Sequence, residues 1–365
     1  MAQILKHPTL AAYAGCDAVV QLAPDRADTP IKMLQITDMQ FIDSAQMRFP
    51  TRLCRDEYLA WLPEKFDAVC ADHIRALVAQ TQPDVIFITG DMVYGSFDDS
   101  GRTFMRYCEL MDSFGIPWAP VFGNHDNETA LGVAWQCEML ESRPWCLFSR
   151  GSVTGNGNYT VGVAVGEQLV RVLYMTDSNG CGDTTDPEVM RHQGIFPDQM
   201  ARIRESAEKI RAAQGQTVPA IMAFHIPIVE FRTAELAKGY ATEERPRYVL
   251  AVDVPAEQGD FGCRLERFHP IATPEDFMRF AKDCGIDEVC AGHCHNNNSS
   301  IVYDGVRFTF GLKTGQYDYH IPGLLGGTLH TQLRGALTVT HVPSTVMYAP
   351  YKPTAPALNR IIEKE

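Results

Sequence analysis

Metal-competent polar residues follow short apolar runs at five places in this chain of 365 residues, and this pattern constrains the fold more than any other feature. The apolar runs are predicted strands at 31–37, 85–89, 119–122, 218–224 and 288–291. They are followed by Asp38, Gly90-Asp91, Gly123-Asn124-His125-Asp126, His225 and Gly292-His293-Cys294-His295, respectively. Open α/β sheets bind ligands at the carboxyl ends of their strands. The pattern therefore predicts one shared site.

Helical and extended apolar spacing alternate along the rest of the chain. Helices are predicted at 64–80, 103–113, 197–213 and 274–284, and further strands at 158–165, 169–176, 299–303, 306–312 and 335–341. Alternating units that end in strand-rich sequence are typical of mixed sheets covered by helices. We expect an α/β fold.

The domain organisation is predicted from composition and regularity. No linker divides the chain, so we expect a single domain over 1–365, with its core at about 31–342. Segments 1–30 and 350–365 have weak periodicity and are expected to be peripheral. The irregular stretch 239–273 is predicted to be a surface insertion that shapes the substrate pocket.

Charge and composition exclude several classes of partner. The 32 Lys and Arg residues are outnumbered by 45 Asp and Glu, and a net charge of -13 would repel a nucleic acid polymer. A small anionic substrate would need metal ions or a few placed cations to meet its charge. No apolar stretch reaches the ~18 to 20 residues of a bilayer span, which predicts no membrane partner.

The compartment is predicted from the N-terminus and the cysteines. Pro8 interrupts the first apolar run, so a secretory signal is not expected. The 11 cysteines include no CxxC pair and are expected to be reduced thiols. Both features indicate a cytoplasmic protein.

The individual motifs differ in specificity. A single Asp after a strand is usually a cap or turn residue. His293 and His295 are two apart in an extended segment and face the same side, so both can reach one ion or two adjacent ions. Two structural histidines would produce the same pattern. The ordered set of D-x-Q, GDxxY, GNHD, a strand-end FH and GHxH is far more specific than any one motif.

This ordered set resembles the calcineurin-like metallophosphoesterases, and more closely their purple acid phosphatase-like branch, in the small form without an N-terminal fibronectin-like domain. The segment Phe224-His225-Ile226-Pro227 with Glu230, and the strand end at Asp177, carry the closer resemblance. It covers about 31–341. The resemblance implies a four-layer α/β/β/α sandwich of two mixed sheets flanked by helices.

The resemblance also implies a centre of two metal ions, either Fe, Mn or Zn. Asp91 would bridge the ions, Asp38 and His295 would bind the first, and Asn124, His225 and His293 would bind the second. His125 would be the catalytic histidine. The implied reaction is hydrolysis of a small phosphomonoester by metal-bound hydroxide. A phosphodiesterase acting on a cyclic nucleotide or another small diester is the alternative, and a non-catalytic metal-binding scaffold ranks below both.

One position departs from the superfamily pattern, because Gln40 stands where D-x-H would place a histidine. The resemblance to purple acid phosphatases makes Tyr94 of GDxxY a candidate phenolate ligand of the first ion, and a packing role is the alternative. Gln40 is itself a candidate ligand or water-holding residue. Oxygen donors would favour Fe(III) or Mn(II) at this position.

Other polar residues are weaker candidates. Asp126 is predicted either to orient His125 through Nδ1 or to cap a helix. His320 is a candidate substrate-binding residue or a surface histidine. A phosphate clamp could be drawn from Arg232, Arg245, Arg247, Arg264 and Arg267. The run 296–298 of asparagines is expected to serve a turn.

Overall fold

The structure is a computed structural model. It describes residues 2–42, 66–98, 100–180, 192–241, 252–253, 259–271, 273, 276–316, 320 and 324–346.

Five strands form the smaller sheet, in the order β15-β14-β3-β4-β5. They are β3 (Ile31–Ile36), β4 (Val85–Thr89), β5 (Trp118–Val121), β14 (Gly326–Leu333) and β15 (Ala336–Pro343). β3, β4 and β5 are parallel, whereas β14 and β15 are antiparallel additions. β4 reads VIFIT and is buried throughout, as expected of a strand covered on both faces.

Eight strands form the larger sheet, in the order β1-β2-β6-β7-β8-β11-β13-β12. They are β1 (Gln3–Lys6), β2 (Ala18–Leu22), β6 (Tyr159–Val165), β7 (Gln168–Met175), β8 (Ala220–Ala223), β11 (Ile286–Ala291), β12 (Ser300–Tyr303) and β13 (Val306–Phe310). β7, β8, β11 and β13 are parallel, as are β2 and β6, whereas the pairs β1/β2, β6/β7 and β12/β13 are antiparallel. Two parallel strands, β8 and β11, thus lie side by side within it.

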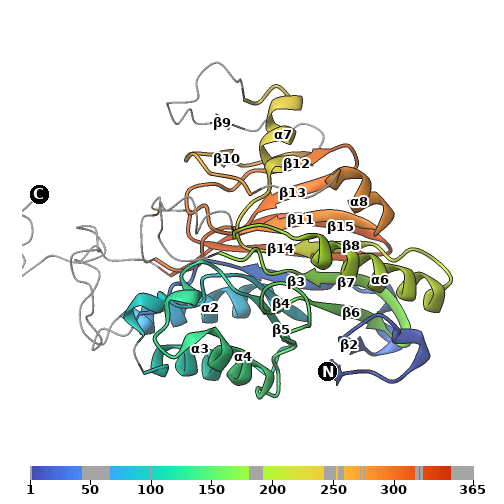
Figure 1. Cartoon of the computed structure of the whole chain (residues 1–365), viewed down its shortest axis with the longest axis horizontal. Helices are drawn as coiled ribbons and strands as arrows, with labels where there is room; N and C mark the ends of the chain where they lie inside the picture. The colour runs from blue at the N-terminus through green and yellow to red at the C-terminus, as the bar shows by residue number, and fades with distance from the viewer. Residues whose placement is uncertain are drawn as a thin grey trace, which may run out of the picture.

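Helices cover the outer face of each sheet (Figure 1). α2 (Phe66–Thr81), which contacts β3 and β14, lies with α3 (Arg102–Ser113) and α4 (Gly132–Glu141) on the side of the smaller sheet. α6 (Pro197–Gln214), α7 (Val229–Ala237) and α8 (Phe277–Asp283) pack on β7, β12 and β11 of the larger sheet. The chain is therefore a four-layer α/β/β/α sandwich of two mixed sheets, as predicted.

Polar side chains bridge the interface between the two sheets. The His330 Nδ1 atom of β14 lies 3.0 Å from Glu288 Oε2 of β11, and its Nε2 atom lies 3.3 Å from Gln35 Oε1 of β3. Arg171 of β7 donates from Nε to Gln332 Oε1 of β14 at 2.6 Å. All five side chains are buried. The contact of His330 with Gln35 lies within the smaller sheet, whereas those of His330 with Glu288 and of Arg171 with Gln332 join the two sheets. Because a buried polar group without a partner is costly, these two pairs help to fix how the sheets face each other.

The N-terminal segment is part of the core, contrary to the expectation that 1–30 lies at the periphery. β2 pairs with β6 inside the larger sheet, and Val19 and Val20 are fully buried. At the other end, β15 extends to Pro343. The core thus begins before residue 31, and the segment 350–365 lies outside the described residues.

Four longer elements, β2, β14, α4 and α7, are absent from the predictions. β14 shows the physical reason most clearly, because its buried alternate residues are the polar Thr328, His330 and Gln332. An inward face made of polar residues removes the apolar alternation by which a half-buried strand is recognised. The described parts of 239–273 include a two-stranded sheet of β9 (Val252–Asp253) and β10 (Cys263–Arg264).

Candidate metal centre

The carboxyl ends of five parallel strands bring the predicted ligands together. They are Asp38 after β3, Asp91 after β4, Asn124 after β5, His225 after β8, and His293 and His295 after β11. One oxygen or ring nitrogen from each of Asp38, Asp91 and His225 lies within 4.8 Å of the other two. Residues far apart in sequence therefore share one small volume at the edges of both sheets.

Glycine precedes three of the candidate ligands because the atoms of neighbouring strand ends leave no room for a Cβ atom. A Cβ atom added to Gly90 would lie 2.5 Å from His225 Nδ1, and one added to Gly123 would lie 2.1 Å from Asp91 Oδ1. At Gly292 a Cβ atom would lie 2.1 Å from Thr37 Oγ1. The GD, GN and GH pairs therefore reflect the close approach of neighbouring strand ends.

Several residues of the centre have left-handed backbone angles, which are uncommon for residues other than glycine. The φ angle is 52° at Asp38, 48° at Gln40, 53° at Asp91 and 69° at His293. Such angles are unfavourable locally and persist where the surrounding structure enforces them, often at functional sites.

The second-ion side of the centre consists of Asn124, His225 and His293. The Asn124 Oδ1 atom lies 3.0 Å from His225 Nε2 and 3.0 Å from His293 Nδ1. His225 Nδ1 is 2.7 Å from the carbonyl oxygen of Thr89. A carbonyl only accepts, so Nδ1 carries a proton. In the neutral tautomer the lone pair is then on Nε2, which faces the amide oxygen. A nitrogen and an oxygen that both present lone pairs in a buried site suit a cation between them.

The first-ion side consists of Asp38 and His295. Asp38 Oδ2 accepts hydrogen bonds from Thr37 Oγ1 at 2.7 Å and from the backbone nitrogen of His293 at 3.0 Å. Asp38 Oδ1 is buried without a hydrogen-bond partner and lies 3.3 Å from His295 Nε2. An orphaned carboxylate oxygen beside an imidazole nitrogen fits a metal ligand pair.

Charge balance around Asp38 favours the ionised carboxyl. Burial by itself would raise the pKa of Asp38, but His295, His225 and Lys313 together hold it well below its usual range. Burial and the neighbouring His225 lower the pKa of His293 to about 3, so this imidazole is neutral and able to ligate.

Asp91 lies between the two sides. Its Oδ1 atom accepts a hydrogen bond from the backbone nitrogen of His125 at 2.9 Å and is 3.4 Å from His225 Nε2. Its Oδ2 atom accepts from Gln40 Nε2 at 3.3 Å. This central position suits a bridging carboxylate.

Gln40 is held by a buried lysine that the motif analysis did not single out. Lys313 Nζ donates to Gln40 Oε1 at 2.7 Å and to the backbone oxygen of Asp38 at 3.0 Å. Gln40 is fully buried, and Lys313 is 1% exposed. The carbonyl oxygen predicted as a candidate ligand is therefore bonded to Lys313. Lys313 lies just after β13, at one more strand end, and this position is the signal that would have found it.

His125 is oriented by Glu128, not by Asp126 as one prediction held. The His125 Nδ1 atom is 3.0 Å from Glu128 Oε2. Asp126 instead accepts from the backbone nitrogens of Gly123 at 2.7 Å and Val93 at 3.0 Å, which ties two strand ends together. Burial and the nearby Asp91 raise the pKa of Asp126. The i,i+3 spacing of His125 and Glu128 was the available signal.

Tyr94 packs against the predicted catalytic histidine. The ring centroids of Tyr94 and His125 are 4.2 Å apart with an interplanar angle of 30°. The tyrosine side chain is 4% exposed. Stacking on His125 accounts for its burial, and metal ligation by its hydroxyl stays a prediction.

The remaining candidates have mixed outcomes. Arg264 Nε is 2.8 Å from Glu235 Oε2, so an acidic side chain neutralises it. Arg245 and Arg247 lie outside the described residues. Burial lowers the pKa of His73 on α2, and the nearby His320 lowers it further. Clamp roles for Arg232 and Arg267, and a substrate role for His320, stay predictions.

Two residues of the asparagine run form hydrogen bonds with the segment that includes β10. Asn297 Oδ1 accepts from the backbone nitrogens of Leu265 and Glu266, and Asn298 Oδ1 accepts from that of Cys263. These bonds give Asn297 and Asn298 a structural role in joining two segments, whereas the predicted role was in a turn.

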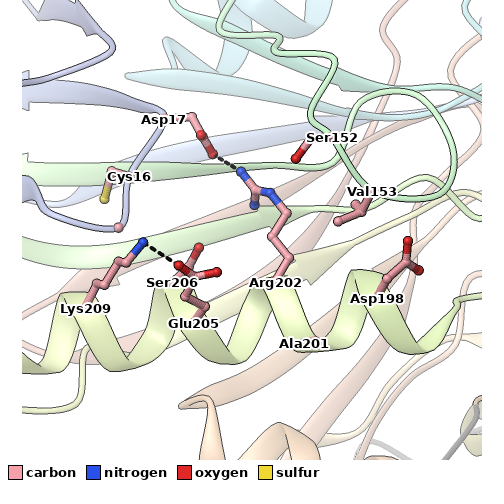
Figure 2. Close-up of a pocket in the computed structure, with 11 residues that line it drawn as sticks. Cys16, Asp17, Ser152, Val153, Asp198, Ala201, Arg202, Glu205, Ser206 and Lys209 are labelled. Atoms are coloured by element: carbon pink, nitrogen blue, oxygen red, sulfur yellow. Dashed lines mark hydrogen bonds and ion pairs between the residues drawn. The ribbon is translucent and has the colours of Figure 1, made fainter.

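A separate open pocket lies along α6 (Figure 2). Its two cationic side chains are engaged, because Arg202 points to Asp17 at 2.5 Å and Lys209 to Glu205 at 2.6 Å. The local positive charge is thus compensated, and this pocket does not resemble an anion site.

Comparison with known proteins identifies the family. The model of the calcineurin-like phosphoesterase family matches residues 31–297. This chain belongs to that family. The match begins at β3 and ends just after the GHxH motif, so it contains every predicted metal ligand.

Two Arabidopsis thaliana relatives indicate the purple acid phosphatase-like branch, as the motifs predicted. Probable inactive purple acid phosphatase 28 is 29% identical over 82% of this chain and 73% of its own length. Probable inactive purple acid phosphatase 14 is 24% identical over 80% of this chain and 72% of its own. Purple acid phosphatase PPD1 from yellow lupin has a TM-score of 0.44 and 12% identity, covering 90% of this chain and 54% of that one.

No helix among the described residues has the length and apolar character that a membrane span requires.

Proposed function

We propose that this protein is a phosphoesterase with a dinuclear metal centre and that its substrate is a small phosphomonoester. The observation that carries the proposal is the convergence of lone pairs at Asn124 Oδ1, His225 Nε2 and the orphaned Asp38 Oδ1 in one buried volume. Family membership supports the reaction class.

The ligands fall into two sets that share Asp91. Asn124, His225 and His293 would hold one ion, and Asp38 and His295 the other, with Tyr94 a candidate for completing the latter. When bound, two cations would neutralise phosphate oxygens and lower the pKa of a water molecule, so that hydroxide is available near neutral pH. Fe, Mn and Zn all suit this donor set.

The chain itself supplies proton transfer and alignment. Glu128 fixes the His125 ring through Nδ1, so the proton for the leaving oxygen would come from Nε2. Thr89 fixes the tautomer of His225, and the backbone nitrogen of His125 holds Asp91. These contacts are formed by the protein alone, which favours a preorganised site.

Partners and compartment follow from charge and thiols. The net charge of -13 favours a small phosphorylated substrate met at the metal centre, and it disfavours nucleic acid polymers and anionic membranes. Nine cysteines in the described residues are free thiols. Reduced thiols support a cytoplasmic location.

The test compares para-nitrophenyl phosphate with its bis ester, using protein reloaded with Mn²⁺, Zn²⁺ or Fe²⁺ and analysed for bound metal. We expect faster turnover of the monoester. His125→Asn should keep the metals and lower kcat by about 10² or more. The exposed Lys282→Gln, which disrupts only an ion pair with Asp304, is the matched surface control.

Two results would change the assignment. Faster hydrolysis of the bis ester would make the protein a phosphodiesterase. Fewer than two bound ions and no turnover of either ester would make it a metal-binding module, and the word inactive in the names of both plant relatives makes this result worth distinguishing.

A further inference from the structure

Two histidines on the neighbouring strands β14 and β15 have different hydrogen-bond surroundings. On β15, His341 Nδ1 lies 3.0 Å from Thr328 Oγ1, and His341 Nε2 lies 2.6 Å from the backbone oxygen of Asn298. A carbonyl only accepts and a hydroxyl can donate, so a single proton on Nε2 satisfies this ring. Burial lowers the pKa of His341 to about 4, which agrees with a neutral imidazole at neutral pH.

His330 on β14 faces an oxygen with each of its ring nitrogens. Nδ1 is 3.0 Å from Glu288 Oε2, and Nε2 is 3.3 Å from Gln35 Oε1. The other end of the Gln35 amide fixes its orientation, because Gln35 Nε2 lies 3.0 Å from Thr89 Oγ1 and 3.2 Å from the backbone oxygen of Ala291. The NH₂ group must face the carbonyl, so the amide oxygen faces His330 and Nε2 of His330 must donate.

The contact between His330 and Glu288 requires one more proton, on either the ring or the carboxyl group. Thr309 Oγ1 donates to the other carboxyl oxygen of Glu288 at 2.8 Å. Burial by itself would raise the pKa of Glu288, but His330, Thr309 and the buried Arg171 hold it below its usual range, although Arg171 also pairs with Asp287. These contacts favour the carboxylate, which leaves the proton on Nδ1 of the ring.

We propose that His330 is a buried imidazolium at neutral pH and that, through Gln35 and Thr89, it is a positioning residue for the candidate metal ligand His225. An imidazolium only donates, so it holds the Gln35 amide oxygen and directs the NH₂ group to Thr89. The carbonyl oxygen of Thr89 accepts from Nδ1 of His225 at 2.7 Å. The effect on His225 rests on the metal centre of the proposed function, whereas the charge of His330 does not.

The charge is tested by nuclear magnetic resonance on the whole metal-free chain, labelled with ¹⁵N and ¹³C, at pH 7. Ring signals are assigned through their bonds to the backbone, which requires no variant. We expect two ring N–H protons in His330 and one, on Nε2, in His341. A single ring proton in His330 would overturn the proposal.

A metal ion at the same place would also overturn the proposal. Glu288, Cys290 and His330 each offer a ligand atom within 4.8 Å of the others. A metal ion held there would take the place of the proton on the ligating ring nitrogen. An ion that stays bound after chelation, together with a single ring proton in His330, would be that result.

Two substitutions test the positioning role. Glu288→Gln removes the charge that stabilises the imidazolium, and Gln35→Met keeps the ion pair but removes the link to Thr89. Each should shift the Nδ1–H signal of His225 and weaken Mn²⁺ binding, measured by electron paramagnetic resonance, by about 10-fold or more. Gln35→Met serves as the test if Glu288→Gln does not fold. His341→Gln is the matched control and should change neither the His225 signal nor Mn²⁺ binding.

An unchanged His225 signal with unchanged Mn²⁺ affinity in both Glu288→Gln and Gln35→Met would overturn the positioning role. A doubly protonated His330 in a protein that hydrolyses neither ester would uphold the charge and refute the proposed function. Rapid ester hydrolysis with a single ring proton in His330 would do the reverse.

Discussion

Removing the Glu128 carboxylate should slow catalysis by loosening His125. Glu128 Oε2 lies 3.0 Å from His125 Nδ1, and the two side chains are 11% and 6% exposed, so water screens the contact little. A hydrogen bond to a charged group contributes about 1.5 to 3 kcal/mol. If this energy is felt in the transition state, Glu128→Ala lowers kcat by roughly 10- to 100-fold, since each 1.4 kcal/mol is about tenfold.

Glu128→Gln should give a loss of kcat between those of the wild type and Glu128→Ala. Its carbonyl oxygen still accepts from Nδ1, but a neutral hydrogen bond contributes only about 0.5 to 1.5 kcal/mol, so the loss should be several-fold smaller than in Glu128→Ala. The assay is kcat and KM with para-nitrophenyl phosphate, together with bound Mn²⁺. We expect kcat to fall while KM and metal content stay near wild type.

A double variant separates positioning from general damage. Glu128 acts through His125 in this scheme, so adding Glu128→Ala to His125→Ala should cost nothing further. Multiplicative losses in the double variant would refute the scheme, and so would an unchanged kcat in Glu128→Ala.

Two further predictions address the scaffold. Gly123→Ala places a Cβ atom 2.1 Å from Asp91 Oδ1 and should lower Mn²⁺ occupancy, with destabilisation of about 1 to 3 kcal/mol in urea unfolding. Gly132→Ala, at φ 78° in open space, should be destabilised by about 1 kcal/mol but keep its metal, and equal metal content in both variants would contradict the role of Gly123. Glu288→Gln breaks the fully buried pair with His330 and should cost about 3 to 5 kcal/mol. That loss lowers Tm by roughly 4 to 6 °C in calorimetry for a chain of this length, and a shift under about 1 °C would show that the pair is not stabilising.

The convergence of the candidate ligands could be predicted from sequence because each of them is positioned by local structure. Asp38, Asp91 and Asn124 follow strands that run parallel in one sheet, and His225 and His293 follow neighbouring strands of the other. The apolar runs predict the strands, and parallel strands bring their carboxyl ends to one edge. To predict that the strand ends of both sheets meet, one also has to know that the two sheets pack face to face. The family resemblance implied this packing.

Contacts between side chains were harder to predict than strand positions. Asp126 and Glu128 are one and three residues beyond His125, and sequence spacing alone did not decide which carboxylate reaches Nδ1. The structure resolves this because backbone nitrogens of Gly123 and Val93 engage Asp126. Lys313 reaches Gln40 across 273 positions of sequence, and its burial has no local signature.

β14 was missed for the same reason, because contacts with residues far apart in sequence determine its structure. Its polar residue His330 faces inward because Glu288 and Gln35 on other strands are there to meet it. Read alone, the segment contains no buried apolar face, and its strand character follows only from its partners.

This polar interior also reaches the metal centre. Glu288 contacts His330, His330 contacts Gln35, and Gln35 Nε2 donates to Thr89 Oγ1 at 3.0 Å. The carbonyl oxygen of the same Thr89 receives Nδ1 of His225 at 2.7 Å. A continuous set of contacts thus runs from the interface of the sheets to a candidate metal ligand. Because the last contact places a proton on Nδ1 of His225, packing of the two sheets helps to orient this candidate ligand.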